Sequence, residues 1–517
     1  MSAPSRFSRR DWLIAAALLV GGVWLRVPFH THYAYHWDGV QFALAMHQYS
    51  VALSQPHAPG YYLYVALGRL VDRFLDDPAA SLVWLNTFTS SGVAALLYIL
   101  GVTLFEDRRV GWAAGLFALT SPQFWFHGCV AQNYATDAFL VCGLAAWGWR
   151  TTQRGGRWGD LVVLGLIMVL VAGVRPQSAV ALLPWWGFVF WECEAGRLRK
   201  FLTVSALVAV LSLGWVVPMV NQSGGLRVYL EIIHLYQRTS APLTFAGGGW
   251  SALTENLLWA ELFSLNGLML GALSLAGAIG YRFFRWDAPR RQAWRNRAGR
   301  AMTFLAWWGW PLFLFGTLVQ FTVQPGYVLG YLAPLVLLSA VGLARLRSTA
   351  TYALATTLVV GGNLFAFLAW PPAWDCVFHN ETRTARELST HDAQLRQAIA
   401  AIRAHADPAR AVVCHAILAH FLFGFRHFQL YLPEFEQYQL ALDPTLPTPP
   451  GRPFWHARQG QLDFAAIDFT GSDRVLLVVP PGLTLEIFRE WFPIARAEPL
   501  AGSGGTVYAL AVGPAAR

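Results

Sequence analysis

The sequence predicts a polytopic α-helical membrane protein of about eleven spans, followed by a small C-terminal α/β domain. Three observations lead to this fold class. Of the 517 residues, 55% are hydrophobic and 13% are charged, whereas soluble domains carry about 25% charged residues. Apolar runs of near-spanning length recur up to residue 370, after which shorter helical and strand-like stretches begin. The 24 tryptophans and 34 phenylalanines suit aromatic rings at bilayer interfaces, so the lipid bilayer surrounds most of the chain.

Residues 1–370 form the predicted transmembrane module. A helix needs about 20 residues to cross the hydrocarbon core and about 17 at the lower limit. No small-residue cleavage site follows the first apolar run, which we therefore interpret as an uncleaved span. Arg175-Pro176 separates two short runs, which form either two spans or one broken helix pair. The predicted spans lie at about 12–29, 82–104, 111–127, 134–150, 160–174, 176–191, 201–220, 255–281, 302–322, 327–344 and 351–370.

Arginines in the loops predict the orientation. When alternate connections are assigned to one side, that side receives most of the basic residues, including seven arginines between Arg282 and Arg300. The other side has few, among them Arg175, Arg227 and Arg238. By the positive-inside rule the arginine-rich side and the N-terminus are cytoplasmic, in a bacterial inner membrane. The net charge of +9 therefore reflects orientation, and no basic patch indicates a nucleic-acid partner.

The stretch 58–75 decides the sidedness of everything after it. Its uninterrupted apolar part, Tyr61–Leu67, is too short to span, and charged residues follow at Arg69, Asp72 and Arg73. Counting it as a span would place the arginine-rich loops outside. We therefore predict a juxtamembrane helix in the outer interface. The outer loops are then 30–81, 127–133 and 221–254, and residues 371–517 form a soluble extracytoplasmic domain.

The C-terminal domain is predicted to be a small α/β fold. Helical periodicity runs over about 384–404, and strand-like stretches lie at 411–414, 475–479 and 506–512. No glycine-rich phosphate loop follows a strand, so the pattern gives no sign of a nucleotide site.

Each of two outer loops contains one carboxylate that suits chemistry. Asp38 is the only acidic residue between Phe29 and His57. A carboxylate at the mouth of a helix bundle can act as a general base or bind a cation. The alternatives are a solvated residue or an N-cap of the amphipathic helix that follows. Asp137 opens the predicted span 134–150, where an N-cap is the default interpretation.

Two basic residues accompany these carboxylates. His57 lies in the same loop as Asp38 and could donate to a phosphate or be merely solvated. Arg175 lies where Pro176 breaks the helix, which lets a charged side chain face a cavity, and a snorkelling arginine is the alternative. The five cysteines show no metal-ligand spacing. No metal site is therefore assigned, although the loop carboxylates could ligate a divalent cation.

The order of several motifs along the first 200 residues is similar to that of a known family. Asp38 is followed by His57-Ala58-Pro59-Gly60-Tyr61, and then come Asn86, Ser90 and the stretch Ser121-Pro122-x-x-Trp125 before a tyrosine-containing turn. This order resembles the GT-C superfamily of membrane glycosyltransferases. It is most similar to the protein O-mannosyltransferase-like branch, which is related to the lipid A aminoarabinose transferases. The rest of the chain resembles the superfamily only in general architecture.

The resemblance implies roles for the loop residues. Asp38 becomes the catalytic base, Asp137 the acid of the second loop, and His57 and Arg175 the groups that hold a lipid phosphate. The remaining substrate-binding candidates are Tyr61, Gln132 and Tyr134.

The chain departs from the branch at Gln132-Asn133-Tyr134, because relatives often carry glutamate just before this tyrosine. Glutamine can position a substrate but cannot act as a base. Either Asp137 supplies the acid of the second loop, or that role is absent from this chain.

The implied activity is transfer of a sugar, a hexose or a pentose, from a polyprenyl-phosphate donor to an extracytoplasmic protein, lipid or polysaccharide. No nucleotide-sugar pool exists outside the cytoplasm, so the donor has to arrive in the membrane. Asp38 would take the acceptor's proton, and the nucleophile would displace polyprenyl phosphate with inversion. Two alternatives stay open: a transporter or flippase of polyprenyl-linked glycans, and a non-catalytic envelope assembly protein.

Overall fold

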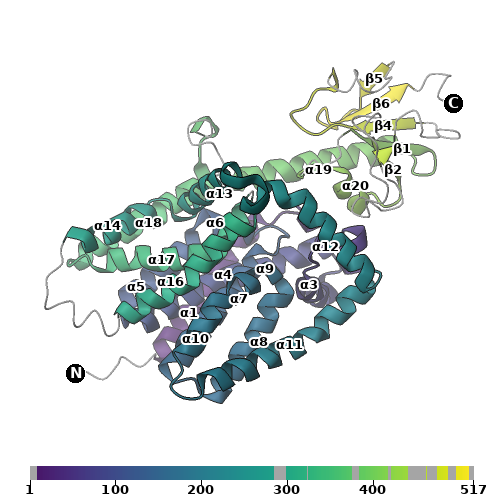
Figure 1. The fold of residues 1–517 in the computed structure, drawn as a ribbon. Coiled ribbons are helices and arrows are strands. Elements are labelled where there is room, and N and C mark those ends of the chain that lie inside the picture. The colour runs from purple at the N-terminus through teal and green to yellow at the C-terminus, as the bar shows by residue number, and fades with distance from the viewer. Residues whose placement is uncertain are drawn as a thin grey trace.

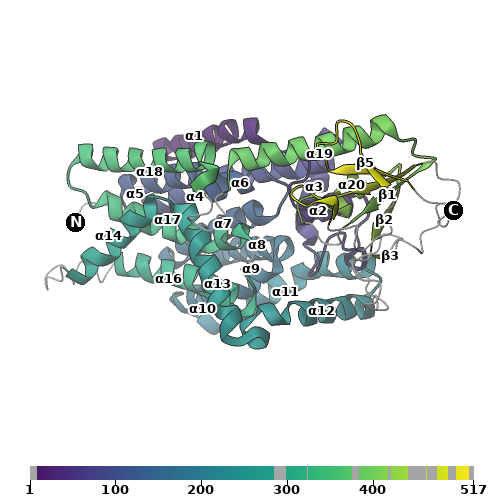
Figure 2. The ribbon, with the colours of Figure 1, turned by 90° about the horizontal axis from the view of Figure 1, so that it is seen from above.

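The computed structural model describes residues 8–284, 298–322, 324–374, 383–416, 421–440, 461–462, 474–486 and 496–511. A bundle of helices carries a domain with a six-stranded sheet at one end (Figure 1). The first helix, α1 (Arg9–Arg26), begins at the end of the bundle far from this sheet (Figure 2). The bundle and the C-terminal domain are the two parts of the predicted fold class.

The centre of the bundle is α4 (Pro78–Phe105), which carries no charged residue along its whole length. A Cβ on Gly101 would lie 2.8 Å from the backbone of Gly111, so α4 and the next helix approach each other closely. Small residues at such crossings are typical of helices packed in a membrane. The helices that pack around α4 are α1, α3 (Tyr62–Leu75), α5 (Arg108–Thr120) and α7 (Tyr134–Gln153).

The predicted break at Arg175-Pro176 is present. α8 (Trp158–Val174) ends there, and α9 (Pro176–Ala181) begins with the proline at its first position, where a missing N–H costs no hydrogen bond. Arg175 itself is extended, with φ −150° and ψ 92°. The chain then continues into α10 (Leu183–Trp191) and α11 (Arg197–Gln222).

The predicted continuous span over 255–281 is wrong. The structure has two helices there, α13 (Phe245–Leu268) and α14 (Gly271–Phe284), bent by 105° at their junction. Met269 between them has φ +46°, a left-handed conformation that ends α13. Hydropathy alone could not show this bend, because the apolar run continues through it.

By length and composition, six helices in the described ranges can cross a membrane, and the bent pair makes a seventh if it is one span. α8 is a shorter apolar helix. These apolar helices make the chain a multi-pass membrane protein. The number of eleven spans stays a prediction. The helices that complete the bundle are α6 (Pro122–His127), α16 (Ala298–Leu314), α17 (Leu329–Ala344) and α18 (Thr349–Ala369).

Arginine-rich connections contact one another at the end of the bundle where α1 begins. Arg108 Nε lies 2.8 Å from Asp11 Oδ1, and Arg109 donates to the carbonyl oxygen of Leu346 at 3.0 Å. At the opposite end, α2 (Trp37–His47) and α3 lie beside the sheet (Figure 2). The stretch 58–75 is therefore helical as predicted; its position in the outer interface and the sidedness of both ends stay predictions.

The C-terminal domain contains the predicted helix and strands. α19 (Ala385–His405) and α20 (Phe425–Tyr431) pack on one face of a sheet with strand order β3-β2-β1-β4-β6-β5. The neighbouring strands from β3 to β4 pair parallel, and β6 is antiparallel to both of its neighbours, β4 and β5. The strands are β1 (Ala411–His415), β2 (Glu436–Leu440), β3 (Gln461–Leu462), β4 (Arg474–Val478), β5 (Arg496–Pro499) and β6 (Val507–Ala511).

This domain holds the first outer loop directly. The carboxylate of Asp392, on α19, accepts the backbone N–H of His32 at 2.7 Å and that of Tyr33 at 3.1 Å. Arg426 donates to the carbonyl oxygen of Leu53 at 2.6 Å. The backbone N–H of Trp37 donates to the carbonyl oxygen of Phe421, also at 2.6 Å. The domain therefore fixes the segment of chain that leads into α2.

Candidate active site

Asp38 lies in the first turn of α2, where the partial positive charge of the helix N-terminus favours a carboxylate. The interpretation of Asp38 as the N-cap is wrong, because His36 caps the helix: its Nδ1 accepts the backbone N–H of Asp38 at 3.1 Å. A Cβ on Gly39 would meet the carbonyl oxygen of Ala131 at 2.8 Å. This glycine lets α2 press against the second outer loop and brings the two loops together.

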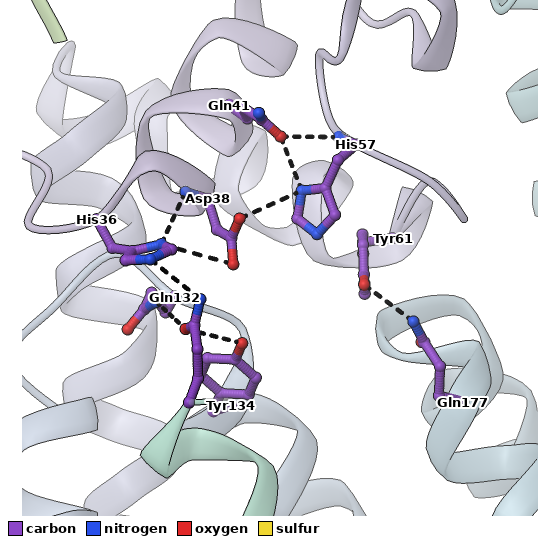
Figure 3. A network of polar contacts seen from close by, with 9 residues as sticks. His36, Asp38, Gln41, His57, Tyr61, Gln132, Tyr134 and Gln177 are labelled. Carbon is purple, nitrogen blue, oxygen red and sulfur yellow. Dashed lines mark hydrogen bonds and ion pairs between the residues drawn. The ribbon is translucent and has the colours of Figure 1, made fainter. Parts of the chain in front are cut away.

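Two imidazole rings flank the Asp38 carboxylate (Figure 3). Its oxygens lie 3.6 Å from His36 Nδ1 and 3.7 Å from His57 Nδ1, longer than hydrogen bonds. Burial lowers the pKa of His36 to about 4 and lowers the pKa of His57 below its ordinary value. Both rings are therefore neutral near pH 7, and within the described part of the chain the carboxylate accepts no hydrogen bond.

His57 is not merely solvated, which was the alternative interpretation of this residue. Gln41 Oε1 accepts its backbone N–H at 3.1 Å and lies 2.8 Å from its Nδ1. The ring of Tyr61 lies 4.9 Å from the imidazole, and the Tyr61 hydroxyl accepts from Gln177 at 3.0 Å. Gly60, with φ +121°, and Tyr61, with φ +48°, form the turn that brings these rings together.

The second outer loop contributes Gln132 and Tyr134, which meet a residue from a distant segment. Gln132 Nε2 and the Tyr134 hydroxyl each donate to Gln324 Oε1 at 3.1 Å, and the other end of the Gln324 amide lies 3.0 Å from His36 Nε2. Three neutral polar groups therefore line the site next to Asp38 (Figure 3). Such groups suit the hydroxyls of a sugar.

Arg175 and Asp137 form a buried pair. Arg175 Nη1 lies 3.5 Å from Asp137 Oδ2, and Ser178 donates to the same oxygen at 2.7 Å. The guanidinium lies over the rings of Tyr134 and Tyr327, at 5.0 and 4.8 Å. Arg175 therefore does not snorkel. The N-cap interpretation of Asp137 is also wrong, because α7 begins at Tyr134 and Asp137 lies within its first turn.

Asn86 and Ser90, which belong to the family-like pattern, support the second loop from below. Asn86 Nδ2 donates to the carbonyl oxygens of Val130 and Gln132, at 2.7 and 2.6 Å. Ser90 Oγ donates to the carbonyl oxygen of Phe124 at 2.5 Å. Both residues are buried in α4, so their role is to satisfy backbone groups that no water reaches.

Sequence reasoning missed His36, Gln41 and Gln324 as members of the site. One signal was present for the last: Pro-Gly-Tyr occurs at 325–327 as well as at 59–61, and both copies enter the site. A Cβ on Gly326 would lie 2.1 Å from the Tyr134 ring, so only glycine allows this approach. His36 and Gln41 carried no comparable signal, because their roles depend on the α2 geometry.

No group of three or more histidine, cysteine, aspartate or glutamate side chains within the described ranges is arranged to hold a metal ion. The site as described consists of the first-loop residues, the second-loop amide and hydroxyl groups, and the Arg175–Asp137 pair. Of the predicted site residues, Asp38, His57 and Tyr61 lie together on α2 and the turn before α3. Gln132 and Tyr134 join them through Gln324, and Arg175 through Tyr134.

The chain is similar in fold to two crystal structures of ArnT, a lipid A aminoarabinose transferase, from Cupriavidus metallidurans. The structure bound to undecaprenyl phosphate has a TM-score of 0.59 and 13% identity, over 99% of this chain and 100% of that one. The apo structure has a TM-score of 0.57, with 13% identity over 96% and 97%. The oligosaccharyltransferase AglB from Archaeoglobus fulgidus matches with a TM-score of 0.45 and 11% identity, over 98% of this chain and 75% of that one.

No family model and no curated protein sequence matches the chain. The apolar helices and the structural match define a polytopic membrane protein with the GT-C fold. More particularly, the fold is that of ArnT over nearly the whole of both chains. The likeness to the O-mannosyltransferase-like branch stays a prediction.

Proposed function

We propose that the chain is an integral-membrane glycosyltransferase that moves a sugar from a polyprenyl-phosphate donor to an extracytoplasmic acceptor, with inversion at the anomeric carbon. The observation that carries the proposal is the Asp38 carboxylate, which lies in the first turn of α2 between two neutral imidazoles. The fold supports it, because ArnT is a transferase and one of its structures holds undecaprenyl phosphate.

Asp38 is the proposed general base. The acceptor hydroxyl or amine gives its proton to the carboxylate while its heteroatom bonds to the anomeric carbon. The bond from that carbon to the phosphate oxygen breaks, and its electron pair leaves with polyprenyl phosphate. Before a phosphate binds, neither imidazole is charged near pH 7, so no ion pair then competes for the Asp38 oxygens.

The other residues take supporting roles in this proposal. Arg175 and His57 face the departing phosphate, whose negative charge is stabilised more strongly in a poorly hydrated site. Gln132, Tyr134 and Tyr61 hold the sugar hydroxyls. Asp137 acts through Arg175, whose guanidinium it orients, and so is a positioning residue. The proposed step uses no divalent cation.

The test is sugar transfer by the purified chain in lipid nanodiscs, with a panel of polyprenyl-phosphate hexoses and pentoses and extracted envelope acceptors. Asp38→Asn should lower the rate by about 10²- to 10⁴-fold, the usual contribution of a general base. Asp76→Asn is the matched control, because Asp76 is an exposed carboxylate beyond α3. Near-normal transfer by Asp38→Asn would refute the assignment, and no transfer with any donor would favour a transporter or an assembly protein.

A further inference from the structure

The contact between Gln41 and His57 determines which ring nitrogen carries the hydrogen. The backbone N–H of His57 donates to one atom of the Gln41 side chain at 3.1 Å, and Nδ1 of the ring lies 2.8 Å from that same atom. A backbone N–H can only donate, so the atom is the amide oxygen, which can only accept. Nδ1 therefore carries the hydrogen. In the neutral ring, Nε2 is left with a bare lone pair.

Nε2 is the nitrogen that points into the site. Figure 3 shows it on the far side of the ring from Gln41, toward the space between Asp38 and Tyr61. Among the residues that the structure describes, Nε2 makes no hydrogen bond. The ionisable groups around the ring are Asp38 and His36 from α2 and its cap, Tyr61 from the turn before α3, and Arg175 from the break between α8 and α9.

A bare lone pair repels a phosphate oxygen, so neutral His57 in this tautomer cannot hold a phosphate. Moving the hydrogen to Nε2 would set the lone pair of Nδ1 against the oxygen of Gln41 and lose the 2.8 Å hydrogen bond. The remaining way to place a donor on Nε2 is to protonate the ring. Imidazolium donates from both nitrogens, so it keeps Gln41 and gains the phosphate.

We infer that His57 takes up one proton at Nε2 when the site binds the phosphate of a polyprenyl phosphate, so that binding is linked to proton uptake. This rests on the proposed function and adds a regulation of its donor site by pH. Burial already keeps the ring neutral in the empty site, because it lowers the pKa of His57. A phosphate dianion at hydrogen-bond distance raises that pKa by favouring the charged ring.

The sign of the linkage follows directly. The pKa of His57 is higher in the phosphate-bound protein than in the free protein. The affinity added by protonation is therefore complete below the pKa of the free protein, and it is lost as the pH rises through the pKa of the bound protein. The second ionisation of a phosphate monoester has a pKa of about 6 and is nearly complete above pH 7. Between pH 7 and 9, affinity should therefore fall by up to about tenfold per pH unit, from His57 alone.

The experiment uses the full chain in nanodiscs and undecaprenyl phosphate as the probe. Calorimetric titrations at pH 7.5 in two buffers of different ionisation enthalpy measure the protons bound per ligand, with an expected value approaching one. His57→Arg carries a permanent charge and should bind with no uptake and little pH dependence. Gln41→Leu frees the tautomer, so the neutral ring can donate from Nε2, and uptake should fall while binding persists.

Each contrary result identifies what fails. Binding by the unaltered chain without proton uptake would overturn the inference and leave the proposed function intact. Full uptake by His57→Arg would overturn it too, because the proton would then go to another group. If the unaltered chain does not bind undecaprenyl phosphate at all, the proposed lipid-linked donor fails and the inference fails with it.

Discussion

Asp38 and Asp137 are the carboxylates of the two outer loops, and their surroundings separate their roles. Asp38 accepts no hydrogen bond from the described residues and is flanked by neutral rings. Asp137 is buried, and one of its oxygens already contacts both Arg175 and Ser178. A base needs free lone pairs and access to substrate, and the Asp38 side chain is 18% exposed whereas that of Asp137 is 3% exposed. The two carboxylates therefore have different surroundings, which is why we propose Asp38 as the base and Asp137 as a positioning group.

At the residue scale, Asp137→Asn should destabilise the protein by about 3–5 kcal/mol, because it leaves the Arg175 guanidinium buried without its counter-charge. The double variant Asp137→Asn/Arg175→Gln removes the unpaired charge and should recover part of the loss. Thermal unfolding in detergent, followed by tryptophan fluorescence, measures the order of the three melting temperatures. A double variant that melts below Asp137→Asn would contradict this account.

The element that closes the site is the short 3-10 helix η5 (Pro325–Val328), which packs Gly326 against Tyr134 and presents Gln324. It comes from the connection between α16 and α17, far along the chain from both outer loops. Its tight contact with α7 is what allows one amide to accept from Gln132 and Tyr134 while lying 3.0 Å from His36. The two outer loops thus depend on a third segment for their relative position.

At this element scale, Gly326→Ala should displace η5 and break the Gln324 contacts, because the new Cβ would overlap the Tyr134 ring. Overpacking of this kind destabilises a fold by about 1–3 kcal/mol. Loss of the Gln324 contacts should in addition lower transfer roughly tenfold, which corresponds to about 1.4 kcal/mol of activation free energy. Gly330→Ala is the control, since its Cβ would lie 3.4 Å from Leu312, an ordinary contact. Steady-state transfer rates and melting temperatures of both variants check the expectation; equal effects at the two glycines would argue against it.

The fold at the element scale was predictable where proline or charge marks a boundary. The helix break was predicted from Arg175-Pro176. The stretch 58–75 was not counted as a span because it contains Arg69, Asp72 and Arg73. The bend at Met269 was missed because the run stays apolar enough on average to be read as one span, although Asn266-Gly267, a dipeptide typical of turns, lies just before it. Likewise the motif order singled out Asp38 and His57, and the helix break singled out Arg175. Gln41 joins the site only through tertiary contacts that no local pattern encodes, and for Gln324 the only signal was the repeated Pro-Gly-Tyr beside it.

For the whole molecule, the sidedness of the two ends is the prediction on which the function depends. Single cysteines at Asp407 and at Arg347, both exposed and at opposite ends, test it in a Cys376→Ser background. The other four native cysteines are buried. A membrane-impermeant maleimide should label Asp407→Cys in intact spheroplasts, and Arg347→Cys only after permeabilisation. The reverse pattern would place the site in the cytoplasm, where a lipid-linked donor is not required.

The hydrogen bonds between the C-terminal domain and the first outer loop have a consequence for biosynthesis. Translation delivers the loop bearing Asp38 to the membrane long before the ribosome reaches Asp392 and Phe421, which hold that loop in the finished molecule. Until those residues arrive, the backbone N–H groups of His32, Tyr33 and Trp37 lack the partners that fix them. The proposed activity should therefore begin only when the C-terminal domain docks on this loop.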